Sequence, residues 1–244
     1  MLTRYIALVA EKADITMAEL SAVAGALQKQ AIRDFGPAWG VLKAIVSPYK
    51  RLADVPLGYW PIVVKDRLDR PDAAGYHEDE HGQPCSLVLR TDDWTVTASH
   101  EMLEMLADPW GRHLVSGPSP CHPGHQVRFL VEVCDPCPDA TYQVDGVTVS
   151  DFYTPRFFDP ASAPDVRYSH RGRITEPRQV LKGGYLTWYD PALRQWWHRA
   201  WFTDKSTDAH IQIPQIVAGN IRAGGNIRAA IDRHLAGVKP PRAL

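Results

Sequence analysis

The prolines of this chain are concentrated in its second half, where 14 of the 20 follow residue 108. Proline fixes one backbone angle and lacks an N–H group, so it interrupts helices and central strands. We therefore expect the longer helices and strands within residues 1–111, and a loop-rich half with short strands over residues 112–244. The chain has 244 residues and can bury a sizeable core, so we expect one domain over residues 1–244.

The first half combines strand and helix patterns. Thr16 and Glu19 have the spacing of a capping box before a helix that we expect to end at Gly36. A second helix is expected to end at Asp108, because Pro109 cannot continue it. The helices are expected over residues 16–36 and 95–108, the strands over residues 4–11, 39–49, 58–66 and 85–93, and a polar turn region over residues 71–84.

The second half offers shorter elements. Asp145-Gly146 lies between alternating apolar residues, which predicts a β-hairpin. Strands are expected within residues 125–135, 140–155 and 183–190, and a terminal helix over residues 224–241. The mixed order of strands and helices predicts the α+β class.

Charge and hydropathy restrict the partners of the chain. The net charge is −1 and the pI is about 6.8, which gives no electrostatic footprint for nucleic acid or for an anionic membrane. Arg4, Glu11, Lys12 and Asp14 interrupt the N-terminal apolar stretch, so we expect no signal peptide. The expected location is the cytoplasm, or a phage-like particle into which the protein is packaged.

The segment "TVTASHEMLEMLADPWG", residues 95–111, carries the strongest chemical pattern. Residues four apart share a helix face, so His100 and Glu104 are expected to point together and could hold one zinc ion. Glu101 lies about 100° further around the helix, where the general base of a zinc hydrolase stands. Asp108 lies one turn beyond Glu104 on the same helix face. It could orient a metal ligand without binding the ion itself, or it could simply end the helix. An ordinary amphipathic helix explains the same spacing.

A further ligand would have to come from another segment. Glu132 and Asp135 interrupt the apolar run "FLVEVCDPC", in which we expect a strand. A carboxylate in such a run is costly to bury unless it is paired, protonated or bound to a metal. The alternative is that these side chains face solvent from a half-buried sheet.

Four segments together resemble a known family: "SHEMLEMLADP", "EVCDP", "DGVTVSDFYTP" and "GGYLTWYD". They resemble zincin-like proteins of bacteria and phages that are described as metallopeptidases. Members carry a His-Glu-x-x-Glu helix ending in Asp-Pro, then a Glu-x-x-Asp strand, a hairpin and a Gly-Gly-Tyr segment. The resemblance covers roughly residues 75–190. By fold analogy, we expect a zincin-like domain in which a small mixed sheet backs the metal-binding helix.

The resemblance implies site residues and a chemistry. It makes His100 and Glu104 the helix ligands of a single Zn²⁺ ion and Glu101 the base that takes a proton during hydrolysis of a peptide bond. Glu132 becomes the third ligand, with Asp135 as its rival or its hydrogen-bonding partner. Glu104 stands where peptidases usually have histidine, and the more anionic site would weaken the Lewis acidity of zinc. The implied partner is a peptide or protein substrate.

Two residues could donate a hydrogen bond to the oxyanion of that reaction. They are Tyr185 in "GGYLTWYD" and His77 in "GYHEDEH", and each could instead be a packing or solvent-facing residue. The second function that the sequence allows is a catalytically silent, zincin-like component of a phage-derived particle. Such a component would bind other particle proteins.

Two further clusters have competing explanations. Cys121, His122 and His125 could combine with Cys134 and Cys137 in a structural zinc site, or the cysteines could be free thiols. Four cysteines, with Cys85 as the fourth, are too few for a disulfide scaffold at this length. The aromatic cluster Trp196, Trp197 and Trp201 could anchor a partner or fill a core.

Overall fold

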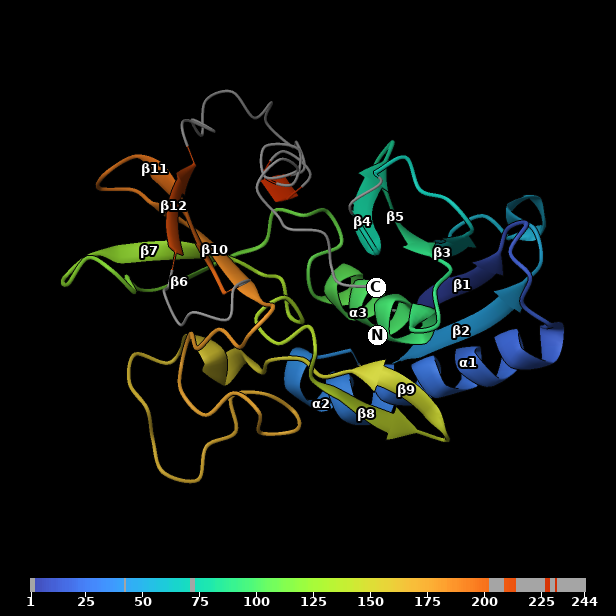
Figure 1. Cartoon of the computed structure of the whole chain (residues 1–244), viewed down its shortest axis with the longest axis horizontal. Helices are drawn as coiled ribbons and strands as arrows, with labels where there is room; N and C mark the ends of the chain where they lie inside the picture. Colours follow the sequence, from blue (N-terminus) through green and yellow to red (C-terminus); the bar gives the residue numbers. More distant parts are fainter. Residues whose placement is uncertain are drawn as a thin grey trace. The chain divides into compact units, whose positions relative to one another are not determined.

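The computed structural model describes residues 3–41, 43–70, 73–201, 209–213, 227–228 and 231 (Figure 1). The chain forms two compact units. Unit 1 contains residues 1–109 and the segment 141–150, and unit 2 contains residues 110–140 and 151–240. The segment 141–150, which we expected in the second half, therefore belongs with the first. The expectation of a single domain stays a prediction.

Unit 1 is built on a five-stranded mixed sheet of order β2-β1-β3-β5-β4. Its strands are β1 (Arg4–Ala10), β2 (Ala44–Tyr49), β3 (Trp60–Lys65), β4 (Gly75–Glu80) and β5 (Gln83–Leu89). Neighbouring strands run parallel except at one edge, where β4 is antiparallel to β5. Strand β1 lies inside the sheet, and its residues 6–9 are fully buried, which accounts for its continuous apolar sequence.

The edge strand β4 corrects one expectation. Residues 71–84 are polar and were expected to form a turn region, but residues 75–80 pair with β5. The turn itself is confined to His81 and Gly82, which have φ angles of 52° and 85° as a tight hairpin requires. The turn expectation was wrong over β4, because pairing with a neighbouring strand outweighed the polar composition of the segment.

The first helix begins as its sequence predicts. Thr16 caps α1 (Met17–Lys29), and its Oγ1 atom accepts a hydrogen bond from the Glu19 N–H at 3.1 Å. The helix continues through a π-helical stretch, η1 (Gln30–Phe35), into α2 (Gly36–Trp39), and ends at Gly40 with a φ angle of 76°. Gly36 does not end it. Gly36 is required for space instead, because a Cβ atom there would collide with the carbonyl oxygen of Val41.

The second helix is α3 (Trp94–Ala107), which packs against β3, β4 and β5. The hairpin of β8 (Thr141–Val144) and β9 (Val147–Ser150) contacts both α1 and α3 (Figure 1). Its turn is Asp145-Gly146, as the sequence predicts.

Hydrogen bonds fix the middle of α3 in this position. The Ser99 hydroxyl donates to Gln30 Oε1 at 2.8 Å and accepts from the Ser150 N–H at 3.0 Å. Gln30 Nε2 in turn donates to the Ser150 carbonyl at 2.9 Å. All three residues are buried, so this network ties α3 to η1 and to the hairpin directly beside His100, the first residue of the predicted metal motif.

Unit 2 contains an antiparallel sheet of order β12-β11-β10-β7-β6. Its strands are β6 (Leu114–Pro118), β7 (Gln126–Leu130), β10 (Tyr185–Asp190), β11 (Gln195–Ala200) and β12 (Ala209–Ile213). Trp196 is buried against Leu130 and Ile231, so this member of the aromatic cluster fills a core. The predicted helix over residues 224–241 lies mostly outside the described residues.

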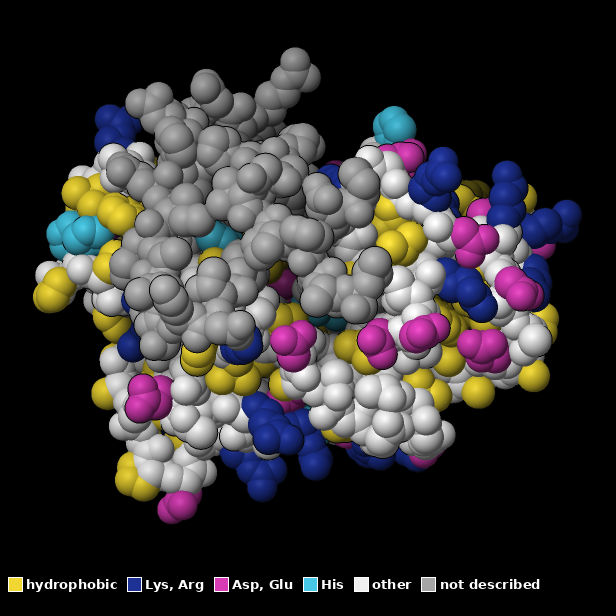
Figure 2. All heavy atoms as spheres, in the orientation of Figure 1, with side chains coloured by type: hydrophobic (Ala, Val, Ile, Leu, Met, Phe, Trp, Pro, Cys, Tyr) yellow, Lys and Arg dark blue, Asp and Glu magenta, His cyan; other side chains and the backbone are white. Residues whose placement is uncertain are grey.

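The remaining elements are two short 3₁₀ helices, η2 (Leu52–Asp54) and η3 (Pro155–Phe158). The mixture of sheets and few helices confirms the predicted α+β content. No helix in the part of the chain that the structure describes has the length and apolar character needed to cross a membrane. Figure 2 shows basic and acidic side chains interspersed over unit 1, in keeping with the near-neutral net charge.

Candidate metal centre

The helix α3 brings the predicted ligand pair together. The Nε2 atom of His100 lies 3.3 Å from the Oε1 atom of Glu104, one helical turn away. His100 is 3% exposed and Glu104 is fully buried. Zinc bonds of about 2.0–2.2 Å at the tetrahedral angle place neighbouring donor atoms about 3.4 Å apart. The pair therefore has the separation of two ligands of one ion, and it is longer than the 2.7–2.9 Å typical of a charge-assisted hydrogen bond.

His77 on β4 completes the group within unit 1. Its Nδ1 atom lies 3.6 Å from Glu101 Oε2 and 3.8 Å from Glu104 Oε2. These distances exceed those of hydrogen bonds. His77, Glu101 and Glu104 are all buried, and their donor atoms lie close enough together to hold a metal ion. Glu104 is thus shared between His100 on one carboxylate oxygen and His77 on the other.

The second nitrogen of His77 carries a proton. Its Nε2 atom lies 3.2 Å from the carbonyl oxygen of Asp108. A carbonyl oxygen only accepts hydrogen bonds, so Nε2 carries the proton of this contact, and Nδ1 faces the two carboxylates. That orientation is favourable only if a proton or a metal ion lies at Nδ1. Metal-binding histidines commonly donate their other N–H to a backbone carbonyl in this way.

A glycine allows β4 to approach the helix this closely. A Cβ atom at Gly75 would lie 2.5 Å from Thr97 Cγ2 and 3.2 Å from Glu101 Cγ. Any larger residue would push β4 away from α3 at the level of Glu101, and His77 is only two residues further along the strand. Gly75 therefore contributes to the site by its lack of a side chain.

Glu132 and Asp135 belong to unit 2 and do not lie on a strand. Strand β7 ends at Leu130, so the expectation of a strand through both residues was wrong. Beyond it the backbone forms a turn in which the Cys137 N–H donates to the Cys134 carbonyl at 3.0 Å, and Pro136 cannot join a sheet ladder.

An arginine compensates the charge of these two carboxylates. Arg228 Nε lies 3.4 Å from Glu132 Oε1, and Arg228 Nη2 lies 3.9 Å from Asp135 Oδ2. All three side chains are buried. The sequence alone did not decide whether the two carboxylates are paired with a cation or bound to a metal, and in the structure the guanidinium of Arg228 is a paired cation. The expectation that Glu132 or Asp135 is a zinc ligand stays a prediction, and so does the location of a single zinc site.

Tyr185 also belongs to unit 2. It is buried on β10, where its ring lies 5.0 Å from the ring of His198 and its N–H donates to the Asp135 carbonyl at 3.0 Å. Its role as an oxyanion donor stays a prediction. Asp108 accepts the hydrogen bond of His77 through its backbone carbonyl, and the expectation that Asp108 orients a metal ligand stays a prediction.

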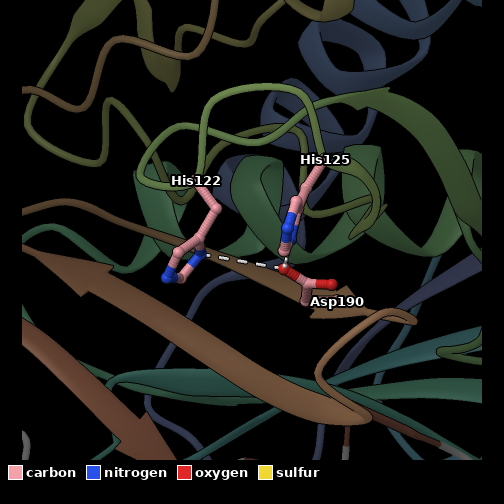
Figure 3. A group of neighbouring side chains, drawn as sticks. All are labelled: His122, His125 and Asp190. Atoms are coloured by element: carbon pink, nitrogen blue, oxygen red, sulfur yellow. Dashed lines mark hydrogen bonds and ion pairs between the residues drawn. The ribbon is translucent and has the colours of Figure 1, made fainter.

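A second cluster lies within unit 2, where His122 and His125 face Asp190 (Figure 3). Burial works to raise the pKa of Asp190. Hydrogen bonds from His125 and from the backbone amides of Leu193 and Ala192 outweigh that effect, so the pKa lies below the ordinary value for an aspartate. Sequence reasoning found the histidines but missed Asp190, which is 65 residues from His125 in the chain.

The predicted cysteine site does not form around these histidines. Cys134 and Cys137 are buried, and within the described residues no group of three potential ligand atoms includes a cysteine. Cys121 alone lies beside the cluster, with its Sγ atom 3.3 Å from His122 Nδ1.

Comparisons of the chain with protein-family models, curated proteins and solved structures find no match.

Proposed function

We propose that the protein is a zinc-dependent metallopeptidase whose ion is bound in unit 1 with Glu104 as the central ligand. The observation that carries this proposal is the position of the Glu104 carboxylate, which is fully buried between the imidazoles of His100 and His77 at 3.3 and 3.8 Å. Imidazole and carboxylate are both ordinary zinc ligands, and their separations suit a shared ion.

The fold of unit 1 supports the zincin-like part of the proposal. A mixed sheet backs α3, and its antiparallel edge strand β4 runs beside the motif helix. A small mixed sheet behind the metal-binding helix is the arrangement that the analogy with a zincin fold implies.

Each side chain then has a role in hydrolysis. When bound, zinc supplies a Lewis acid that lowers the pKa of a water molecule. His100 and Glu104 hold the ion, and Glu101 accepts the proton from the attacking water. His77 donates its Nε2 proton to the Asp108 carbonyl, and its Nδ1 atom faces the Glu101 carboxylate at 3.6 Å.

The structure also offers a competing assignment for Glu101. Together with His77 and Glu104 it forms a three-residue group that could itself hold the ion. In that arrangement Glu101 is a ligand and is not available as a base. The two assignments make opposite predictions for the zinc content of a Glu101→Gln variant.

The test combines metal analysis with digestion of casein and of a peptide library. Wild-type protein should bind zinc and cleave, and Glu104→Gln should lose the ion and the cleavage together. Glu101→Gln should keep the ion and lose cleavage. Loss of zinc from Glu101→Gln would assign the ion to the His77 group. Zinc binding without cleavage of any substrate would contradict the peptidase proposal and favour the silent, particle-associated component.

A further inference from the structure

We propose that unit 2 holds a divalent transition-metal ion of its own, bound by His122, His125 and Asp190. The side chains come from two places in the sequence, the loop before β7 and the end of β10. They meet around one carboxylate oxygen, Asp190 Oδ2 (Figure 3). This site is separate from the motif on α3 and does not depend on the proposed peptidase activity.

Asp190 is held in place by the backbone that follows it. Its Oδ1 atom accepts hydrogen bonds from the N–H groups of Ala192 at 2.9 Å and Leu193 at 3.2 Å. This leaves Oδ2 directed at the two histidines, and the side chain is fully buried. A carboxylate with one oxygen fixed by backbone amides and the other presented to imidazoles is oriented before any ion arrives.

The loop of residues 119–125 presents both imidazoles on one side. The Ser119 hydroxyl accepts hydrogen bonds from the N–H groups of Cys121 and His122, at 3.4 and 3.0 Å. The His125 N–H donates to the His122 carbonyl at 3.1 Å, which closes a turn through Gly124 at a φ angle of 85°. The two rings stack with centroids 5.4 Å apart.

Both histidines turn the same nitrogen toward the aspartate. His125 Nδ1 lies 2.8 Å from Asp190 Oδ2, and His122 Nδ1 lies 3.7 Å from the same atom (Figure 3). The first distance is a hydrogen bond, so Oδ2 already has one imidazole as a partner. The second is too long for a hydrogen bond. A metal ion shared by the three side chains would explain why the second imidazole approaches an oxygen atom that already has a partner.

Cys121 adds a thiol next to this group. Its Sγ atom lies 3.3 Å from His122 Nδ1, but it is not among the ligand atoms that lie within 4.8 Å of one another. Two imidazoles and one carboxylate form a donor set that suits zinc or cobalt(II) and not magnesium or calcium. The side chains of His122 and His125 are 31% and 32% exposed, so an ion can enter from solvent.

The position of the cluster indicates a structural role for this ion. Strand β7 pairs with β10, and the site joins the loop before β7 to the turn after β10. An ion held by both segments would fasten the 119–125 loop to the end of the sheet. Metal binding should therefore raise the thermal stability of unit 2.

The experiment is a cobalt(II) titration of the intact, metal-free chain, with the bound equivalents and the visible absorption recorded. The double variant His122→Ala/His125→Ala should bind one equivalent fewer than wild type, and Asp190→Asn should bind that equivalent at least about tenfold more weakly. His81→Asn is the control, because it removes an exposed imidazole from a turn whose positive φ asparagine tolerates. An unchanged number of equivalents in the double variant would overturn the proposal.

Two further arms keep the result decisive. If the double variant does not fold, Asp190→Asn serves alone, since asparagine keeps the oxygen that accepts from Ala192 and Leu193, and unchanged affinity would then overturn the proposal. Glu104→Gln should keep the unit 2 equivalent, which separates this site from the proposed peptidase centre.

Discussion

The Nδ1 atom of His77 lies 3.6 Å from the Oε2 atom of Glu101, across the contact between β4 and α3. The distance is too long for a hydrogen bond and short enough for strong electrostatic coupling, because both side chains are buried. His77 donates its other nitrogen to the carbonyl of Asp108 at 3.2 Å. A metal ion bound at Nδ1 of His77 should therefore also interact with the Glu101 carboxylate.

Glu101→Gln should lower kcat for peptide cleavage by at least about 100-fold, since a positioned general base contributes that much or more. Glutamine has the same shape and cannot take up the proton. Steady-state kinetics on a fluorogenic peptide from the library would measure the effect, with His81→Asn as the control. A Glu101→Gln chain that binds zinc and cleaves at the wild-type rate would remove Glu101 from the mechanism.

His77→Phe should destabilise the metal-free protein by about 1–3 kcal/mol, because the Asp108 carbonyl loses its donor and two buried carboxylates lose the facing imidazole. Phenylalanine fills a similar volume, so the loss reports polar contacts more than packing. Urea unfolding in the presence of a chelator measures the change. Equal midpoints for the variant and the wild type would show that the imidazole does not stabilise the site.

Several elements could be predicted because their causes are local. The Thr16 cap needs only the Glu19 amide three residues away, and the Asp145-Gly146 turn needs only the alternation around it. The His100–Glu104 pair follows from helical spacing alone. In each case residues close in sequence determine the geometry.

The missed features depend on contacts between distant segments. His77 reaches Glu101 only because residues 75–80 pair with β5 and Gly75 lets that edge approach α3. Asp190 meets His125 across 65 residues, through the pairing of β10 with β7. The periodicity of one segment does not encode contacts with a distant segment. A single sequence therefore shows which residues could bind a metal, but it does not show which of them lie together.

Arg228→Met should destabilise the protein by about 3–5 kcal/mol, because it leaves the buried carboxylates of Glu132 and Asp135 without the guanidinium. Adding Glu132→Gln and Asp135→Asn should restore part of that loss, since the uncompensated charges are then gone. Denaturant unfolding of the single and triple variants measures both. A triple variant less stable than Arg228→Met would contradict the assignment of Arg228 as the compensating cation.

Cys85 should be inert to alkylation at pH 8 in the folded chain. Burial, reinforced by the negative charges of Glu78 and Glu80, raises the pKa of its thiol to about 12. The thiolate is the reactive form, so iodoacetamide should label Cys85 at least about 1000-fold more slowly in the folded chain than in urea, where the thiol has its ordinary pKa of about 8.5. Peptide mass mapping over time gives both rates, and similar rates would contradict the raised pKa.

The same thiol predicts a loss of stability at alkaline pH. Above pH 9 the unfolded chain releases the Cys85 proton while the folded chain keeps it until about pH 12. The folded state then binds more protons, so the free energy of unfolding falls as pH rises through that window. Cys85→Ala should show a smaller fall than the wild type. Parallel pH profiles of the two proteins would show that the thiol does not contribute.

The proposed metal centre around Glu104 is most directly tested by counting zinc ions per chain in wild type and in Glu104→Gln. Glutamine keeps the shape of the side chain and removes the negative charge that would bind the ion. Glu104→Gln should bind one zinc ion fewer than wild type and should retain the ion of unit 2. Equal zinc content and equal affinity in the two proteins would contradict a metal centre on α3.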